Sequence, residues 1–190
     1  LQWGEVHLDG AHDPARPLRV VVGDRVIEAI GTKFNVRIDD SQQIELIVSE
    51  GRVSVGIKPG ASSENMIDLS GLELIAENER IWLGEYRPRA VEVLEPEEIE
   101  VRLSWRNGNL VFRGESLSSA VSEVGRYTNM EFIIQSEELK QLRVAGLFRA
   151  GDVEGFLRSL RANFNIVDER IDGNTISLSQ RIQSSESQTN

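Results

Sequence analysis

Two histidines and two aspartates near the start of the chain are the first side chains to consider for chemistry. His7, Asp9, His12 and Asp13 carry imidazole nitrogens and carboxylate oxygens, which are common metal ligands. His7 and Asp9 are two positions apart, so on a strand they face the same side. However, His12-Asp13-Pro14 is a typical turn sequence, and no other ligand has matching spacing. We therefore expect a structural turn here, with no metal and no cofactor.

A second group of ionisable side chains is the acidic run from Glu95 to Glu100. Paired carboxylates act as acid and base only when their surroundings separate their pKa values, and a charge run beside a proline is usually solvated. The chain has no phosphate-binding loop, Gly-x-Ser-x-Gly elbow or His-Glu-x-x-His motif. The sequence therefore gives no reason to expect a turnover enzyme.

Composition narrows the classes of partner. The 190 residues have a formal net charge of -10 and a sequence pI of about 4.8. Nucleic acids and anionic membranes attract basic surfaces, so this acidic chain is not expected to bind either. With no cysteine, disulfides and thiolate metal sites are excluded. No apolar run is long enough for a membrane helix, and we interpret the chain as a fragment because it opens within a strand-like region.

Residues 1–98 contain short runs of alternating apolar and polar side chains, separated by turn sequences such as Gly23-Asp24 and Glu50-Gly51. Strands of this kind, spaced by about 8–12 residues, are typical of an antiparallel sandwich or roll. The strand-like runs are 20–22, 26–30, 34–38, 44–48, 53–55, 72–75 and 91–93. We expect an all-β domain here, in which Trp82 belongs to the core.

The pattern changes after the acidic run, which reads as a domain junction, and we expect a linker at residues 99–104. Residues 105–180 then read as a small mixed domain. A strand at 110–113 precedes Ser116, which is a good N-cap for a helix with one apolar stripe. The stripe consists of Leu117, Ala120, Val121 and Val124. The whole chain is therefore expected to be α+β.

The second domain repeats itself. Phe148 matches Phe112 at an offset of 36 (148 minus 112), and Asp152 stands where the first repeat has its N-cap. Neither strand–helix–strand unit can bury its helix stripe alone, so we expect a duplicated β-α-β domain with two helices on one sheet. Asp172-Gly173 predicts a hairpin into a last strand, and residues 181–190 read as a disordered polar tail.

Both halves resemble the FecR family of ferric-citrate-type anti-sigma regulators. In the first half the resemblance includes residues 4–17, 29–37 and 48–53, and the Gly-Thr-x-Phe-Asn-Val stretch from Gly31 is its most specific part. In the second half it covers 105–112, Leu117, Arg126-Tyr127 and 144–148, with the Trp-Arg-x-Gly start as the specific part. The second domain is also similar to the short N-terminal (STN) domain of secretins and TonB-dependent transporters.

The resemblance implies a relay across three compartments. An outer-membrane TonB-dependent transporter that has captured a ferric siderophore would present its signalling domain to this periplasmic region. The signal would then pass through a single inner-membrane helix to an extracytoplasmic-function sigma factor, by segments that this sequence lacks. The chain is thus expected to be a protein-binding sensor. Its expected contact residues are Trp105, Phe112, Tyr127 and Phe148.

The resemblance also points to Gly31 and Thr32, because some members of the family cut themselves at a Gly-Thr bond. The threonine hydroxyl attacks the preceding carbonyl in an N-to-O acyl shift, and water hydrolyses the resulting ester. A hydroxyl is a weak nucleophile, so such a bond needs a nearby base and a strained amide. The alternative is that Gly31 is a turn or bulge glycine and Thr32 an ordinary strand residue.

Two other functions stay open. A structural or assembly module of a secretion-type complex is compatible with the second domain alone. A carbohydrate-binding or hydrolytic domain is compatible with the β-rich first half alone. Fold class by itself is weak evidence for either function.

Overall fold

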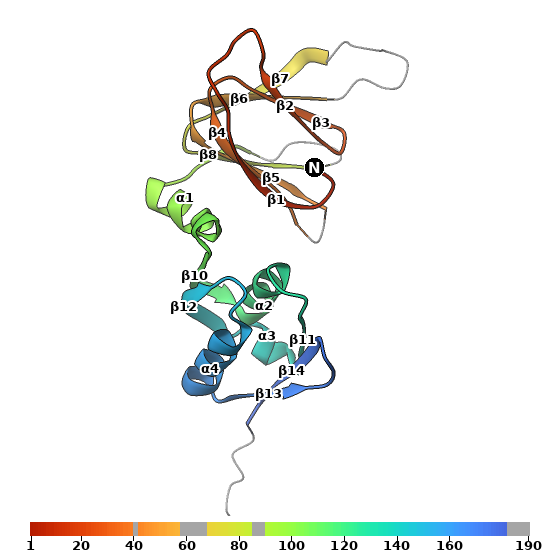
Figure 1. The fold of residues 1–190 in the computed structure, drawn as a ribbon, viewed down its shortest axis with the longest axis vertical. Helices are drawn as coiled ribbons and strands as arrows, with labels where there is room; N and C mark the ends of the chain where they lie inside the picture. Colours follow the sequence, from red (N-terminus) through yellow and green to blue (C-terminus); the bar gives the residue numbers. More distant parts are fainter. Residues whose placement is uncertain (40–41, 58–67, 85–89, 182–190) are drawn as a thin grey trace, which may run out of the picture. The chain divides into compact units, whose positions relative to one another are not determined.

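The computed structural model describes residues 1–39, 42–57, 68–84 and 90–181. The chain divides into two compact units, Leu1–Leu103 and Ser104–Asn190 (Figure 1). No helix in the described ranges is long and apolar enough to cross a membrane. Pro59-Gly60, another dipeptide of the first half that predicts a turn, lies outside these ranges, as does nearly all of the expected disordered tail.

The first unit is built on two antiparallel sheets. The five-stranded sheet runs in the order β1-β4-β5-β8-β9 and the four-stranded sheet in the order β2-β3-β6-β7. The bounds are β1 Gly4–Asp9, β2 Leu18–Val22, β3 Arg25–Ala29, β4 Lys33–Ile38, β5 Ile44–Glu50, β6 Arg52–Ile57, β7 Asp68–Ala76, β8 Glu79–Leu83 and β9 Glu92–Val93. The all-β body that the alternating pattern predicts is therefore present.

One apolar core joins these two sheets. Phe34, Val36 and Ile38 alternate along β4 and are buried at 0%, 0% and 6% exposure, together with Ile27 of β3. The same core includes residues from β5, β6, β7 and β8. Successive side chains of a strand point to opposite faces, so each strand has one face in the core and one face outside it. The core is what fixes the strand that carries Thr32 and its neighbours.

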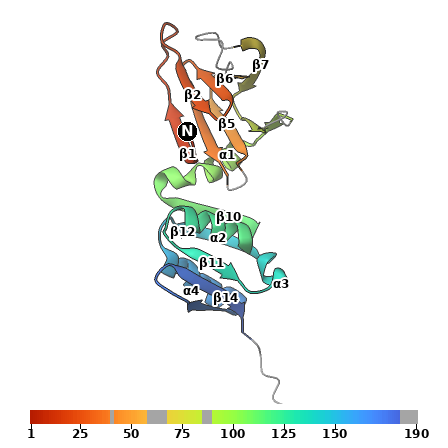
Figure 2. The same cartoon turned by 90° about the vertical axis from the view of Figure 1, so that its right-hand side faces the viewer.

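A helix stands where the sequence predicts a junction and a linker. Helix α1, Pro96–Arg102, is labelled in Figure 2. It begins with Pro96 and has Glu97 and Glu98 in its first turn. Ile99 and Leu103 are four positions apart and pack with Leu94 against Ile47, whose side chain lies on the outer face of β5. This patch is buried, so residues 95–103 belong to the first unit. In the sequence, the charged residues around Ile99 and Leu103 make this apolar i, i+4 pair hard to recognise.

The second unit contains the predicted repeat. A short 3₁₀ turn at Ser104–Asn107 precedes it. The elements are β10 Asn109–Ser116, α2 Leu117–Arg126, β11 Glu131–Ile134, α3 Glu137–Lys140, β12 Arg143–Arg149, α4 Val153–Phe164, β13 Ile166–Arg170 and β14 Thr175–Gln180. The predicted N-caps are both formed: Ser119 N donates to Ser116 Oγ at 3.1 Å, and Gly155 N donates to Asp152 Oδ1 at 2.9 Å. The α+β class is therefore confirmed.

The strands of the second unit form two sheets instead of the predicted single sheet. Strands β10 and β12 pair antiparallel with each other, whereas β11 pairs parallel with β14, which pairs antiparallel with β13. Helix α2 contacts β10, β12 and β11, and α4 contacts β12 and β13. Both helix stripes and both sheets share one core, in which Phe156 is 0% exposed. Because the first strands of the two repeats pair with each other, they cannot also extend the other sheet.

Candidate functional site

Thr32 lies at the entrance to β4 and is almost completely buried, with 1% of its surface exposed. Its hydroxyl donates a hydrogen bond to the Arg52 carbonyl oxygen at 2.9 Å, and the Ile30 carbonyl lies at 3.4 Å. The β4–β5 register shifts between Lys33 and Phe34, directly after Thr32. The threonine is therefore a buried hydroxyl beside an irregularity in the sheet, and not a regular strand residue.

Gly31 has a backbone conformation that favours glycine. Its φ is +62°, in the left-handed region, and the His12 imidazole packs against its α-carbon. A Cβ added at Gly31 would lie 2.7 Å from His12 Cβ and closer still to Nδ1. Two backbone hydrogen bonds hold the same segment in place: Gly31 N donates to Ala11 O at 3.2 Å, and Gly10 N donates to Thr32 O at 3.0 Å. The turn before β2 thus encloses the Gly31–Thr32 peptide.

Gly51 borders the other side of this peptide. Its φ is +83°, and a Cβ added there would lie 3.1 Å from the Gly31 carbonyl oxygen and 3.3 Å from Thr32 Oγ1. The carbonyl oxygen and the hydroxyl oxygen therefore share the space that Gly51 leaves free. An N-to-O acyl shift needs this hydroxyl close to this carbonyl, in a backbone held by its surroundings. The arrangement is compatible with the expected self-cleavage.

The four residues considered as metal ligands do not converge. Asp13 forms the expected turn, with Ala15 N donating to its Oδ1 at 3.1 Å and Arg16 Nε donating to its Oδ2 at 2.8 Å. His12 packs on Gly31, whereas His7 and Asp9 lie on β1. Within the described ranges, no group of three or more His, Asp or Glu side chains is arranged to hold a metal ion.

One carboxylate of the acidic run takes part in a group of ion pairs on α1 and β8. Glu98 pairs with Arg102 at 3.1 Å, and Arg102 also lies 3.4 Å from the buried carboxylate of Glu45. The hydrogen bond from Arg80 on β8 lowers the pKa of Glu92 on the neighbouring strand β9. Glu98, Glu45 and Glu92 thus pair with arginines on α1 and β8. The other carboxylates of the run, Glu95, Glu97 and Glu100, are exposed to solvent.

The residues expected to contact a partner pack mostly within the core of the second unit. Phe112 is only 6% exposed and lies 5.7 Å from Phe148 and 6.3 Å from Phe156, measured between ring centroids. Trp105 and Tyr127 are half-buried and pack against the same core. Phe112 in particular cannot offer a contact surface in this conformation, because its ring fills the space between β10 and α4.

Trp3 and Trp82, the two tryptophans of the first unit, both lie outside its apolar core. Trp82 on β8 is half-buried between Ile81 and Leu83, which both point into the core. Because side chains alternate along a strand, Trp82 lies on the opposite face, so the expectation that it belongs to the core is wrong. Trp3, just before β1, is 79% exposed.

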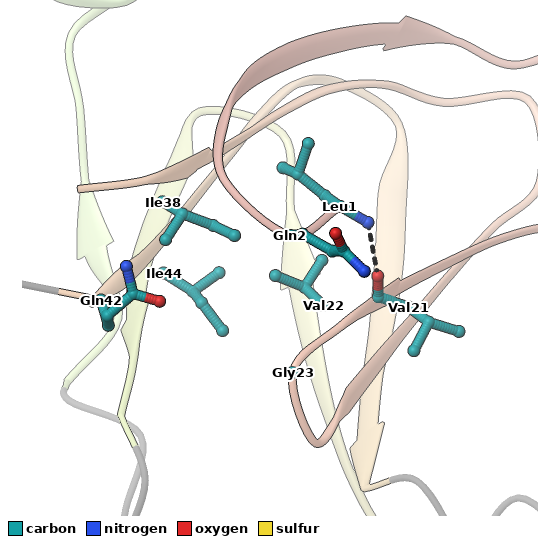
Figure 3. Close-up of a pocket in the computed structure, with 8 residues that line it drawn as sticks. All are labelled: Leu1, Gln2, Val21, Val22, Gly23, Ile38, Gln42 and Ile44. Atoms are coloured by element: carbon teal, nitrogen blue, oxygen red, sulfur yellow. Dashed lines mark hydrogen bonds between the residues drawn. The ribbon is translucent and has the colours of Figure 1, made fainter. Parts of the chain in front are cut away.

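Each unit has a hollow among its described residues. A pocket of about 520 Å³ in the first unit is lined by aliphatic and amide side chains, among them Val22, Ile38 and Ile44 (Figure 3). The Leu1 ammonium donates to the Val21 carbonyl at 2.8 Å at its rim. A second hollow of about 480 Å³ lies beside α2 and β11. The first offers no side chain for acid–base chemistry, and the second is a groove next to a sheet edge.

We expect Gly31→Ala to destabilise the first unit by about 1–3 kcal/mol. The left-handed backbone disfavours a Cβ, and that Cβ would collide with His12. Gly173→Ala is the matched control, since its added Cβ meets nothing within 4 Å and its φ is not in the left-handed region. Urea unfolding followed by circular dichroism measures both. Equal stabilities of the two variants would contradict the strained position of Gly31.

The sequence did not reveal that His12, Gly51 and the Arg52 carbonyl surround the Gly31–Thr32 bond. In the sequence, His12 indicates only a candidate metal ligand or a turn, and Gly51 indicates only a turn. The available signal was weak: the Glu50-Gly51-Arg52 turn falls within the same family-like stretch as the glycine–threonine pair. The separation of His12, Gly31 and Gly51 along the chain does not indicate that the turns carrying them meet in the folded unit.

Comparisons with known proteins agree with this architecture. Residues 1–54 match the profile described as FecR protein, and residues 109–178 match FecR, C-terminal. A candidate anti-sigma factor from Parabacteroides distasonis ATCC 8503 has a similar fold in crystal structures at 1.65 and 2.50 Å resolution. Each has a TM-score of 0.67 and 18% identity and is matched over 95% of this chain and 79% or 78% of that chain. No curated protein matches in sequence. Both units carry the signature of one family in chain order, and the chain therefore belongs to the FecR family of signalling regulators.

Proposed function

We propose that this chain is the periplasmic signal-receiving region of a membrane-anchored anti-sigma regulator. The observation that carries the proposal is the pairing of two family domains, each with its own core, in one chain. A metabolic enzyme would need a pocket with convergent ionisable groups, whereas the pocket of Figure 3 is lined by aliphatic and amide side chains. Two small domains with open sheet edges suit a receiver of another protein.

The proposed partner is the periplasmic signalling domain of an outer-membrane TonB-dependent siderophore transporter. Binding would pass an iron-uptake signal through an inner-membrane helix to an extracytoplasmic-function sigma factor. Both of these steps require segments of a longer protein. The net charge of -10 makes nucleic acid an unsuitable partner for this region.

Strand β11 offers the best supported contact on the second unit. In the described ranges β11 pairs only with β14, so its other edge has backbone groups available for a partner strand. The groove of about 480 Å³ lies beside this edge and combines apolar side chains from α2 and β11 with the charged Glu131 and Lys140. Its lining includes Ser118, Val121, Met130, Phe132 and Ile134. An added strand would gain main-chain hydrogen bonds, and the groove would accept its side chains.

The binding test uses the whole chain and the purified signalling domain of a transporter encoded beside it. We expect Ser118→Arg to weaken binding by about tenfold or more, because it places a long charged side chain in the groove. Ala162→Arg, on the exposed side of α4, is the matched control and should bind like the wild type. Isothermal titration calorimetry reports both affinities.

Two results would contradict parts of this proposal. Wild-type chain that does not bind the signalling domain and instead forms rings by light scattering would favour a structural module of a secretion-type complex. Binding that is unaffected by Ser118→Arg would leave the partner in place but move the contact away from the β11 groove.

We also propose that the chain cuts itself once, at the Gly31–Thr32 bond. Four features of this region support the proposal. They are the left-handed backbone of Gly31, the packing of His12 on Gly31, the burial of Thr32, and the space that Gly51 leaves beside the Thr32 hydroxyl. The Thr32 hydroxyl attacks the Gly31 carbonyl carbon, and its proton moves to the Thr32 nitrogen as the carbon–nitrogen bond breaks. The product is an ester with the same atoms as the amide. Water then hydrolyses the ester to a Gly31 carboxylate and the Thr32 hydroxyl, so that residue 32, whose amine was freed in the first step, becomes a new N-terminus.

A further inference from the structure

The His12 imidazole occupies the position of the side chain that Gly31 lacks. Its Nδ1, Cγ and Cβ are the nearest atoms to a Cβ built on Gly31, and all three would lie within 3 Å of it. His12 is held there by its neighbours, because Ala11 O accepts from Gly31 N and Gly10 N donates to Thr32 O. The imidazole therefore lies beside the Gly31 α-carbon, which is bonded directly to the acyl carbon that an acyl shift would transfer.

The two sides of the Gly31–Thr32 bond differ in their access to water. On the side of Gly51, the Thr32 hydroxyl is buried and donates its proton to the Arg52 carbonyl. On the other side, His12 is exposed to solvent while it touches Gly31. Water that attacks the acyl carbon can therefore arrive beside the imidazole. A neutral imidazole is the side chain best suited to take a proton from water near neutral pH.

We propose that His12 is the general base that activates water for hydrolysis of the Gly31–Thr32 ester. This inference rests on the self-cleavage proposed above. The imidazole takes one proton from water as the water oxygen bonds to the Gly31 carbonyl carbon. The bond from that carbon to Thr32 Oγ1 then breaks, and the imidazolium returns the proton to Oγ1. The Gly31 acid loses its own proton to solvent, so His12 is regenerated and water is the only co-reactant.

The same geometry assigns His12 to the second step and not to the first. In the first step the Thr32 hydroxyl already donates to the Arg52 carbonyl on the buried side of the bond, away from the exposed imidazole, and its proton ends on the Thr32 nitrogen. The acidic side chains that neighbour His12 and Gly51 in the sequence are already engaged. Asp13 binds Ala15 N and Arg16, and Glu50 pairs with Lys33 at 2.5 Å. Among the described residues around the bond, His12 is the side chain that touches Gly31 and also reaches solvent.

Hydroxylamine separates the two steps, because it attacks an ester directly and needs no general base. The experiment incubates three purified proteins at neutral pH, with and without hydroxylamine: the wild type, His12→Gln and His7→Gln. Mass spectrometry then measures the masses of the products. Hydrolysis leaves residues 1–31 as an acid, whereas hydroxylamine leaves them as a hydroxamate. Cleavage at Asn107–Gly108, another bond that hydroxylamine attacks, gives fragments of different mass.

For His12→Gln we expect the rate of cleavage without hydroxylamine to fall about 100-fold, the lower end of typical general-base effects. Hydroxylamine should restore cleavage to a rate near that of the wild type. His7→Gln, the variant of the other histidine, should behave as wild type. Thermal unfolding of each variant checks that the first unit is folded.

Each contrary result has a distinct meaning. A wild type that stays whole with and without hydroxylamine overturns the self-cleavage and this inference together. A wild type that is cut at the same rate as His12→Gln keeps self-cleavage but removes the role of His12. Slow cleavage of His12→Gln that hydroxylamine does not restore shows that His12 acts before the ester forms, and overturns the assignment to the second step.

Discussion

Replacing Thr32 with valine is expected to abolish cleavage between residues 31 and 32 completely. Valine keeps the branched shape of the side chain at a site that is 1% exposed, but it lacks the oxygen that attacks the Gly31 carbonyl. The change also leaves the Arg52 carbonyl without its donor at 2.9 Å, which should cost about 1–3 kcal/mol of unfolding free energy. Mass spectrometry of the incubated chain, with N-terminal sequencing of any fragment, measures the cut.

Thr32→Ser is the control for this prediction. Serine keeps the hydroxyl and should retain cleavage, although with more rotational freedom and a lower rate. Fragments with a new N-terminus at residue 32 in the valine variant would exclude the acyl shift. They would point instead to a contaminating protease or to a nucleophile other than the Thr32 hydroxyl.

Replacing Phe156 with alanine is expected to destabilise the second unit by about 3–5 kcal/mol, the usual cost of removing a buried phenylalanine. Its ring is 0% exposed and lies 5.2 Å from Phe148 and 6.4 Å from Phe132, between ring centroids. A domain of this size has little stability to spare. We therefore expect much of the second unit to unfold, while the first unit stays folded because its core shares no residue with that of the second.

Hydrogen exchange read out by mass spectrometry tests this separation peptide by peptide. Phe34→Ala, at a position that is equally buried in the first unit, is the matched control and should show the reverse pattern. If Phe156→Ala released protection equally from both units, they would unfold as one cooperative body, and the proposal of two separately folded domains would fail.

Local patterns were good evidence for single elements and for the repeat. The alternation at Phe34, Val36 and Ile38 predicted which side of β4 is buried, and the structure confirms it. The N-caps Ser116 and Asp152 were readable because capping depends on a hydrogen bond three residues away. In each case the interacting groups are close in sequence, or every second residue meets the same environment.

Contacts between distant segments were not readable in the same way. Helix α1 packs on the first unit because Ile99 contacts Ile47, an apolar side chain on the outer face of β5 that is far away in the sequence. The second unit has two sheets because β10 pairs with β12 and β11 with β14, a choice that helix periodicity leaves open. Strand pairing depends on backbone groups that every residue carries, so the order of strands leaves little trace in a local pattern.

The sequence by itself determined the β-rich first half, the duplicated second half and the family, because alternation, caps and family motifs are local or colinear. Only the tertiary structure decided what surrounds the Gly31–Thr32 bond. His12 and Gly51 approach it from turns on either side in the sequence, and they meet because β1, β4 and β6 carry those turns to one place in the first unit. Such proximity is set by the long-range packing of the core, which no window of neighbouring residues contains.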